Sequence, residues 1–300
     1  MRGQFHLQGR RGVTLLEVIV AVVIMAVLFG LTLGAIHRVR SAAAHIQSVN
    51  NLRQISLALQ QYSDAGKAGH PPLLGFTPRP PTNWFQPVAF RLQEKSIFHL
   101  MLPYLDVDRG PKPTRASTQE ELDRYFTPQV KVYQSPADPS FAFAESMQDT
   151  ACRNSYVANI QAMDGYLNIP DGTSQTIAFS EHYFYTRAVT MIIRYDDISA
   201  GRPTSLFQGD RRATFADPGW KDVLPVVTPG QPTVSSRPGA TFQYRPRVED
   251  SDGRLPQTPH LGGLPVALFD GSVRTIGPGV SESTFWSLVT PNAGDIPGDY

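Results

Sequence analysis

Cysteine and an excess of one charge are both lacking in this sequence. The single cysteine, Cys152, cannot form an internal disulfide and has no partner thiol for a metal, so we expect it to be a small buried apolar side chain. The 27 basic residues are balanced by 26 acidic ones, which leaves a net charge of +1. Without a strong positive field, nucleic acid is not an expected partner.

The short motifs of the common enzyme classes are also missing. The sequence contains no G-x-S-x-G elbow, no P-loop, no H-E-x-x-H and no Cys/His zinc pattern. Its Ser, His and Asp residues are scattered, and a catalytic triad is defined by geometry rather than by composition. We therefore expect that the protein is not an enzyme and that it needs no cofactor.

What the sequence does contain begins with an asymmetric N-terminus. Arg2, Arg10 and Arg11 precede the first acidic residue, Glu17, and the run from Val18 to Ile36 carries no charge. At about 1.5 Å per residue this run spans roughly the 30 Å hydrocarbon layer of a bilayer. A basic segment before an apolar one stays on the cytoplasmic side. The pattern predicts a single-pass membrane helix with its N-terminus in the cytoplasm.

Two alternatives to a specialised anchor are a cleaved secretory signal and a plain signal anchor. The small residues that could form a secretory cleavage site, Ala42 and Ala44, lie beyond Arg38 and Arg40, which is an unfavourable flank. A plain anchor gives no reason for Glu17, because a carboxylate deep in a membrane helix costs about 2.5 to 3.5 kcal/mol on insertion scales. Both alternatives therefore leave part of the pattern unexplained.

The six residues at the start of the apolar run carry a resemblance to a known family. They are Gly12, Val13, Thr14, Leu15, Leu16 and Glu17. This segment resembles the N-terminus of type IV pilins and type II secretion pseudopilins. The resemblance implies that a prepilin peptidase cleaves after Gly12 and methylates the new amino terminus of Val13, where the family commonly has Phe. It also implies that Glu17 takes part in recognition by the peptidase and in assembly, where it pairs with the amino terminus of a neighbouring subunit. Further partners are therefore the membrane and other pilin-like subunits or copies of this chain.

The apolar helix is predicted to continue beyond the membrane as a stem. Apolar residues recur every three or four positions, at Ile46, Val49, Leu52, Ile55, Leu59 and Tyr62, and Gly66 offers a helix stop. The sequence thus predicts a basic leader over 1–12, a transmembrane and stem helix over 13–65 and an extracytoplasmic globular domain over 66–300. That domain is long enough to bury a sizeable core.

The globular domain is predicted to be α+β with a mainly antiparallel sheet, which together with the long helix is a pilin-like architecture. The 24 Gly and 26 Pro residues favour a loop-rich domain. Its predicted elements are helices over 95–105 and 118–126 and strands over 129–133, 154–160, 176–184 and 189–195, and a hairpin over 266–276. Asp270-Gly271 between the hairpin strands predicts a type I′ turn.

A second resemblance involves the same hairpin. His260, nine residues and then Asp270-Gly271 match the H-x9-DG signature at the C-terminus of a large bacterial family with prepilin-type N-termini and no known function. Further similar stretches are 135–139, 154–159, 171–176 with Glu181, and 286–294, and the family often has Cys where Ser135 stands. For His260, the residues alone allow a structural hydrogen bond to the Asp270 turn, a metal pair or a contact with a partner.

Two further features suggest ligands. Asp250-Ser251-Asp252-Gly253 is similar to half of a calcium loop, and the resemblance to type II pseudopilins makes calcium plausible, although the glutamate that closes an EF-hand loop is missing. The aromatic residues Trp84, Phe85, Trp220 and Tyr244 are either core residues or sugar-stacking platforms.

The sequence as a whole predicts a structural, pseudopilin-like subunit of a secretion or pilus filament. The main alternative is a glycan- or solute-binding domain that a pilin-like anchor displays at the surface. An anchored hydrolase has no motif to support it.

Overall fold

The computed structural model describes part of the chain, in two compact units. The described residues are 14–65, 97–107, 114, 118, 129–142, 154–163, 169–186, 189–192, 209–212, 214–215, 241–253, 255–291, 294 and 297–298. The units divide between Ala43 and Ala44, so the outer part of the long helix packs together with the globular domain. We call residues 44–65 the stem segment.

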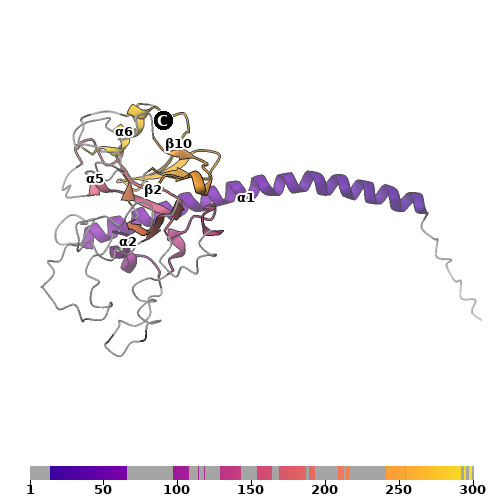
Figure 1. Cartoon of the computed structure of the whole chain (residues 1–300), viewed down its shortest axis with the longest axis horizontal. Helices are drawn as coiled ribbons and strands as arrows, with labels where there is room; N and C mark the ends of the chain where they lie inside the picture. Colours follow the sequence, from indigo (N-terminus) through magenta and orange to yellow (C-terminus); the bar gives the residue numbers. More distant parts are fainter. Residues whose placement is uncertain are drawn as a thin grey trace, which may run out of the picture. The chain divides into compact units, whose positions relative to one another are not determined.

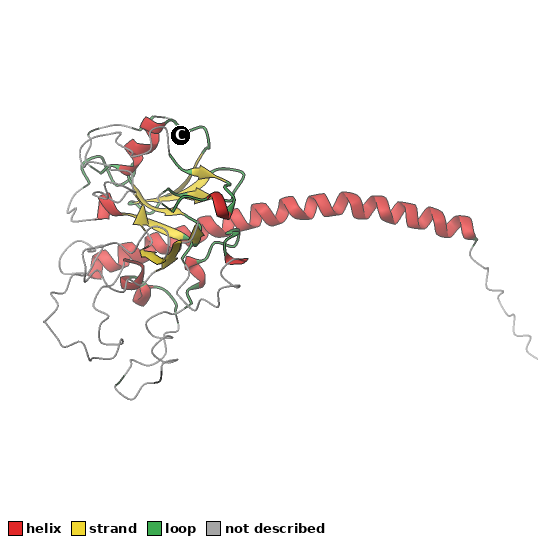
Figure 2. Ribbon diagram, viewed as in Figure 1, coloured by secondary structure: helices red, strands yellow, loops and turns green. Residues whose placement is uncertain are grey.

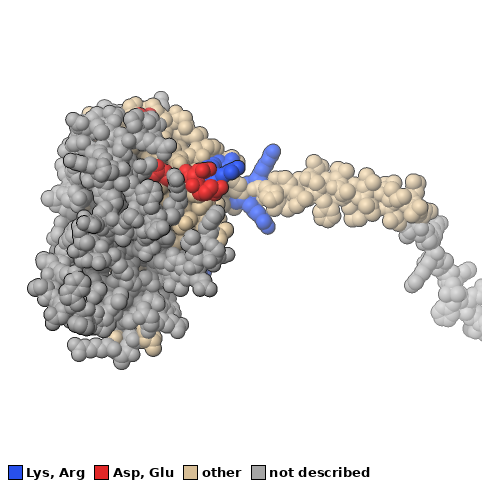
Figure 3. All heavy atoms as spheres, in the orientation of Figure 1, with Lys and Arg blue, Asp and Glu red and all other residues tan. Residues whose placement is uncertain are grey.

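The long N-terminal helix, α1 (Leu15–Ala65), runs through both units without interruption. Over 18–36 it presents an uncharged, exposed surface, and the first Lys or Arg side chains after this run are Arg38 and Arg40 (Figure 3). Among the described residues, α1 is the one helix long and apolar enough to cross a membrane. Because no part of the apolar stretch is buried by the protein itself, its exposure fits a lipid environment.

The centre of the globular unit is a five-stranded sheet with strand order β10-β9-β2-β1-β6. Its strands are β1 (Tyr156–Asn159), β2 (Ile177–Glu181), β6 (Thr214–Phe215), β9 (Leu264–Leu268) and β10 (Val273–Ile276). Within this sheet, every described pairing is antiparallel except that of β1 with β6. All residues of β1, β2 and β9 are buried, which means that both faces of the sheet are covered. The prediction of an α+β fold with a mainly antiparallel sheet is confirmed.

Helices cover the sheet from two sides (Figures 1 and 2). The stem segment lies on one side, where Leu52, Ile55 and Leu59 enter the core, and α6 (Glu282–Val289) lies on the other with Phe285 and Trp286. Ser281 caps α6 by accepting a hydrogen bond from the Thr284 amide. The core is therefore built from both ends of the chain.

Shorter elements complete the described part of the globular unit. They are α2 (Ile97–Leu100), η2 (Leu102–Tyr104), η3 (Lys131–Tyr133), α5 (Ile160–Met163), η4 (Val248–Asp250), the sheet of β3 (Tyr185–Thr186), β4 (Val189–Ile192) and β5 (Gly209–Arg212), and the parallel pair of β7 (Gln243–Tyr244) and β8 (Gln257–Thr258). The predicted strands over 154–160, 176–184 and 189–195 are confirmed as β1, β2 and β4. The helix predicted over 95–105 is present as α2 followed by η2.

One predicted strand is wrong, and one predicted helix lies outside the described residues. Residues 129–133 form η3 instead of a strand, because Tyr133 bonds back to the Val130 carbonyl and its hydroxyl donates to the Phe98 carbonyl at 2.7 Å. The first of these bonds uses a backbone N–H group of the segment, which is then not available for pairing with a neighbouring strand. Of the helix predicted over 118–126, the structure describes Thr118 alone, which is not helical.

Candidate functional site

The N-terminal end of α1 is fixed by a capping box. The Thr14 hydroxyl accepts from the Glu17 amide at 3.3 Å, and the Glu17 carboxylate accepts from both the amide and the hydroxyl of Thr14, at 2.8 and 2.9 Å. This reciprocal arrangement satisfies donors that the first helical turn leaves free. The helix therefore begins at Leu15, two residues after Val13. Gly12 and Val13 lie outside the described residues.

The capping box was missed from the sequence, although its pattern was present. Thr14 and Glu17 stand three residues apart before an apolar run, which is the spacing of a capping box. The family resemblance implies partners for the Glu17 carboxylate only outside the chain. In the single chain, Thr14 already supplies the carboxylate with two donors.

A second group of polar residues is buried where the stem segment meets the sheet. On the stem, Ser48 is fully buried and Asn51 nearly so, while Ile46, which was assigned to the apolar stripe, is exposed. The Asn51 amide donates to the Tyr156 hydroxyl at 3.1 Å and to the Gln134 carbonyl at 3.0 Å. The packed face of the stem is thus partly polar, and periodicity of apolar residues alone did not find it.

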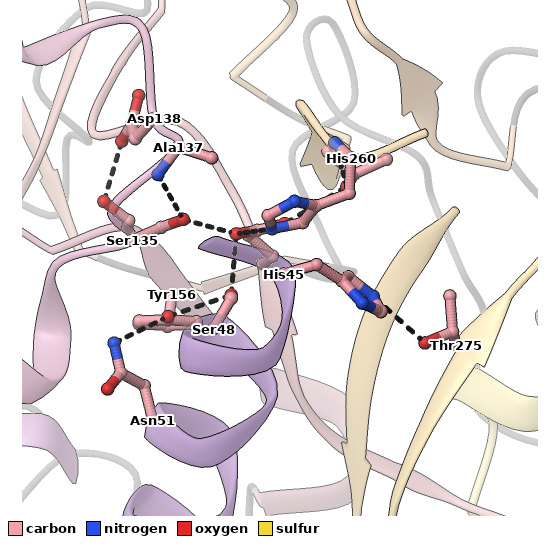
Figure 4. Close-up of polar contacts among 12 residues, drawn as sticks. His45, Ser48, Asn51, Ser135, Ala137, Asp138, Tyr156, His260 and Thr275 are labelled. Atoms are coloured by element: carbon pink, nitrogen blue, oxygen red, sulfur yellow. Dashed lines mark hydrogen bonds and ion pairs between the residues drawn. The ribbon is translucent and has the colours of Figure 1, made fainter. Parts of the chain in front are cut away.

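The side chains of Ser48, Ser135 and His260 point toward one another (Figure 4), and Glu181 at the end of β2 is the centre of this group. Its side chain is completely buried, and its Oε1 atom accepts from the hydroxyls of Ser48 at 2.8 Å and Ser135 at 2.6 Å. The Nε2 atom of His260 lies 3.1 Å from the same oxygen. The Thr258 hydroxyl lies 3.1 Å from Oε2, and its one proton is shared between this oxygen and the Gly263 carbonyl. We call these five residues the Glu181 cluster.

The hydrogen bonds of the Glu181 cluster form a chain that starts on the stem. Because the Ser48 proton is directed to Glu181, the Tyr156 hydroxyl at 3.0 Å donates to Ser48 and in turn accepts from Asn51. Burial raises the pKa of Tyr156, which keeps this hydroxyl protonated. Each polar group between Asn51 and Glu181 therefore has a partner, as a buried network requires.

His260 links the cluster to a second histidine on the stem. The rings of His45 and His260 meet edge to face with centroids 4.9 Å apart, and His45 Nε2 lies 3.4 Å from the Thr275 hydroxyl on β10. Burial, followed by the charge of His260, lowers the pKa of His45. The side chain of His260 is almost fully buried.

The cluster contains a serine, a histidine and a carboxylate, but not in the arrangement of a nucleophilic site. The Ser135 hydroxyl donates to Glu181, so the His260 imidazole is not placed to take its proton. Ser135, Glu181 and His260 are also all buried. As it stands, the arrangement binds elements of the fold to one another rather than presenting a reactive group to solvent.

The Asp270-Gly271 turn makes a separate contact with the stem segment. The Gln60 amide donates to the Asp270 carbonyl at 3.1 Å, and a Cβ atom on Gly271 would lie 2.7 Å from the same Gln60 nitrogen. His260 bonds to Glu181, whereas the Asp270 carboxylate accepts from the Ser272 amide, so the predicted His260–Asp270 hydrogen bond is wrong. The two ends of the H-x9-DG signature instead attach to the stem region at different points.

The hairpin is confirmed, but its turn is not of type I′. Gly271 has φ +86°, whereas Asp270 is not among the residues with positive φ. The Gly271 amide donates to the Leu268 carbonyl and the Leu268 amide donates to the Ser272 carbonyl. This is a three-residue loop that ends in a glycine bulge. Between the ends of the signature, Gly263 at φ +120° leaves room for the Ile276 carbonyl, which a Cβ would meet at 2.1 Å.

Asp138, in the stretch 135–139, is a second fully buried carboxylate. Its oxygens accept from the amide and hydroxyl of Ser140, from the Ser155 hydroxyl and from the Phe184 amide, at 2.5 to 2.9 Å. Burial outweighs these four donors and raises the pKa of Asp138 to about 6. Asp138 thus ties three separate loops together beside the sheet.

The structure describes only part of the two features that suggested ligands, the calcium-like segment over 250–253 and the four aromatic residues. Asp250 ends η4, and the carbonyls of Asp250 and Asp252 accept from the side chains of Gln243 and Gln257. Within the described ranges no three His, Cys, Asp or Glu side chains gather as metal ligands, and calcium at Asp250 and Asp252 stays a prediction. Of the four aromatic residues, Tyr244 alone is described; it is exposed, and its hydroxyl donates to the Leu261 carbonyl.

Two family models match successive parts of the chain. A family model described as a prokaryotic N-terminal methylation motif matches residues 7–33, and one described as a protein of unknown function (DUF1559) matches residues 37–168. The chain is thus similar to prepilin-type N-termini over its first part and to DUF1559 proteins over the part that follows. No curated protein and no solved structure matches it.

The two matches cover different parts of the sites described above. Gly12, Val13 and Glu17 lie inside the methylation motif, which supports a prepilin-like subunit that is processed by prepilin peptidase and anchored to the membrane by one helix. The DUF1559 match contains Ser48, Asn51, Ser135, Asp138 and Tyr156. Glu181 and His260 lie beyond residue 168, so these partners of the DUF1559 residues are identified by the structure rather than by the match.

Proposed function

We propose that this chain is a pseudopilin-like structural subunit of a secretion or pilus filament. Prepilin peptidase cleaves it after Gly12 and methylates Val13, and the mature chain sits in the cytoplasmic membrane with its N-terminus inside and its globular unit outside. Other pilin-like subunits, or copies of itself, then contact the apolar part of α1. The role is structural rather than catalytic.

The observation that supports this proposal is the way α1 begins. The capping box of Thr14 and Glu17 starts the helix two residues after Val13, immediately before an uncharged run that the protein leaves fully exposed. Such a helix presents its apolar surface to lipid or to identical helices. The methylation motif covers the same residues.

The charges that flank the apolar run support this orientation. The leader over 1–12 contains Arg2, Arg10 and Arg11 and no acidic residue, and the polar, buried contacts of the globular unit begin only after Arg40. A basic leader stays in the cytoplasm, and prepilin processing takes place on that side. This arrangement puts Gly12 within reach of the peptidase and the globular unit across the membrane.

The test is N-terminal mass spectrometry of the full chain, expressed in a host with and without prepilin peptidase. With the peptidase, we expect a mature chain that starts at Val13 and carries one methyl group. Gly12→Leu abolishes cleavage because the small residue at the cleavage position is lost. Gly3→Leu, a matched change in the same leader, leaves cleavage intact.

Glu17→Ala separates processing from assembly. We expect the cleaved fraction of this variant to lose its cross-linking to neighbouring subunits through α1, since the carboxylate no longer pairs with a neighbour's amino terminus. An intact chain starting at Met1 in the presence of the peptidase, or a start near His45, contradicts the proposal. Normal cross-linking of Glu17→Ala contradicts the assembly part alone.

A further inference from the structure

The contact between the stem segment and the sheet contains a titratable group that the structural role of the chain does not require. His45 lies on α1 one turn before Ser48, at the start of the globular unit. It is half-buried, and it packs edge-on against His260 while its Nε2 atom faces the Thr275 hydroxyl (Figure 4). Of the residues in this contact, it is the one whose ring reaches both the H-x9-DG histidine and the edge strand β10.

The charged groups around His45 are few. From the H-x9-DG segment it faces His260, and from β2 it faces Glu181, whose Oε1 atom is already held by His260, Ser48 and Ser135. On β10, Arg274 precedes Thr275 and is exposed, so its side chain lies on the other face of the strand. Within the described part of α1, the positions three and four residues away from His45 carry no charge.

We propose that His45 is an acid-sensitive latch between the stem segment and the globular sheet. As a neutral ring it packs on His260 and holds the first turns of the stem, with Ser48 and Asn51, against the Glu181 cluster. As a cation it lies beside a second imidazole in a half-buried site, and the first turns of the stem separate from the sheet. The Gln60 contact with the Asp270-Gly271 turn, four helical turns further along, stays closed.

The direction of the pH effect follows from the surroundings of His45. Removal from water and the neighbouring His260 charge both disfavour the protonated ring and outweigh the attraction of Glu181, so the pKa of His45 is lower in the fold than in the unfolded chain. The folded state then binds fewer protons than the unfolded state. Stability of this contact is complete above the ordinary histidine pKa and falls as the pH drops below about 6.5.

The other buried carboxylate of this unit has the opposite effect. The pKa of Asp138 is raised to about 6, so its protonation on acidification stabilises the fold rather than weakening it. Asp138 bonds to Ser140, Ser155 and Phe184 and has no hydrogen bond to the stem. An acid-induced opening confined to the stem is therefore not explained by Asp138.

Hydrogen exchange of the full chain in detergent micelles, followed by mass spectrometry at pH 8 and pH 5.5, tests the latch. After correction for the intrinsic pH dependence of exchange, protection of peptides within 44–52 should fall at least about threefold at pH 5.5. Protection of α6 should not change. His45→Gln keeps a polar side chain opposite Thr275 but cannot be protonated, so it should keep full protection at both pH values.

His37→Gln is the matched control, because it makes the same change on an exposed position of the same helix and should open in acid like the wild-type chain. His45→Lys places a permanent charge at the latch and should show the open state already at pH 8. Loss of protection in His45→Gln equal to that of the wild type overturns the proposal, as does a wild-type chain with no acid response. If His45→Gln fails to fold, as judged by α6, the wild-type and His45→Lys results decide alone.

Discussion

The two halves of α1, the inner half over 15–43 and the stem segment over 44–65, differ in which side chains they bury. In the inner half, Leu28 exposes 56% of its surface and Phe29 exposes 67%, whereas in the stem segment the polar Ser48 is completely buried. A soluble helix hides its apolar side chains, and the inner half hides none of them. The stem instead buries polar groups, and Ser48 and Asn51 have partners on the sheet or on the loops beside it, whereas the buried Ser56 hydroxyl has no hydrogen bond among the described residues.

One continuous helix therefore has two different surroundings. The inner half has no protein partner within the described residues and needs lipid or other helices to cover it. The stem segment belongs to the globular unit, which begins at Ala44 rather than after the helix ends. Changes in the stem should therefore alter the stability of the globular unit, and changes in the inner half should alter insertion and assembly.

The largest expected effect comes from removing the centre of the buried cluster. Glu181→Ala leaves His260 and the hydroxyls of Ser48 and Ser135 buried without their acceptor. We expect the free energy of unfolding of the globular unit to fall by about 3 to 5 kcal/mol. Denaturant unfolding of the full chain in detergent measures this, with Glu249→Ala at an exposed position of η4 as a control. A loss below about 1 kcal/mol would show that the cluster does not hold the unit together.

A smaller effect is expected from the serine that carries the stem into the cluster. Ser48→Ala removes the hydroxyl between Tyr156 and Glu181, which should destabilise the globular unit by about 1 to 3 kcal/mol. Ser41→Ala, two turns earlier on the exposed part of the same helix, should be neutral. Equal unfolding curves for the two variants would remove the distinction between the halves of α1.

The smallest of these effects concerns the second attachment point. Gly271→Ala must adopt φ +86° and push the Gln60 side chain aside, so it should cost about 1 to 2 kcal/mol. Gly277→Ala, where no atom lies within 4 Å of the new Cβ, is the matched control. Combining Gly271→Ala with Gln60→Ala should recover part of the loss, and strictly additive effects would contradict the contact.

Elements and motifs encoded locally could be predicted from the sequence. The apolar run, the strands around Val157 and Phe179, and the hairpin at Asp270-Gly271 follow from period and turn chemistry within a few residues. The capping box of Thr14 and Glu17 is equally local and could have been found. The turn type could not, because Asp-Gly is compatible with both a two-residue turn and a three-residue loop with a bulge.

The Glu181 cluster could not be predicted, because its members are distant in the chain. Ser48 and Glu181 are 133 residues apart and His260 follows 79 residues later, and no spacing rule relates such positions. The signature His260-x9-Asp270-Gly271 suggested one local site, but its two ends have different partners, Glu181 and Gln60. It is the antiparallel order β10-β9-β2 that brings Glu181, His260 and the Asp270-Gly271 turn to the stem segment of α1.

The central claim, that membrane covers the inner half of α1 and not the stem, can be tested by one labelling measurement. In a Cys152→Ser background, Leu28→Cys and Leu57→Cys place a thiol at positions that expose nearly equal fractions, 56% and 54%. Intact cells, or spheroplasts where an outer membrane intervenes, are treated with a membrane-impermeant maleimide. We expect labelling at position 57 and none at position 28 until the membrane is dissolved. Equal labelling of the two positions in intact membranes would contradict the claim.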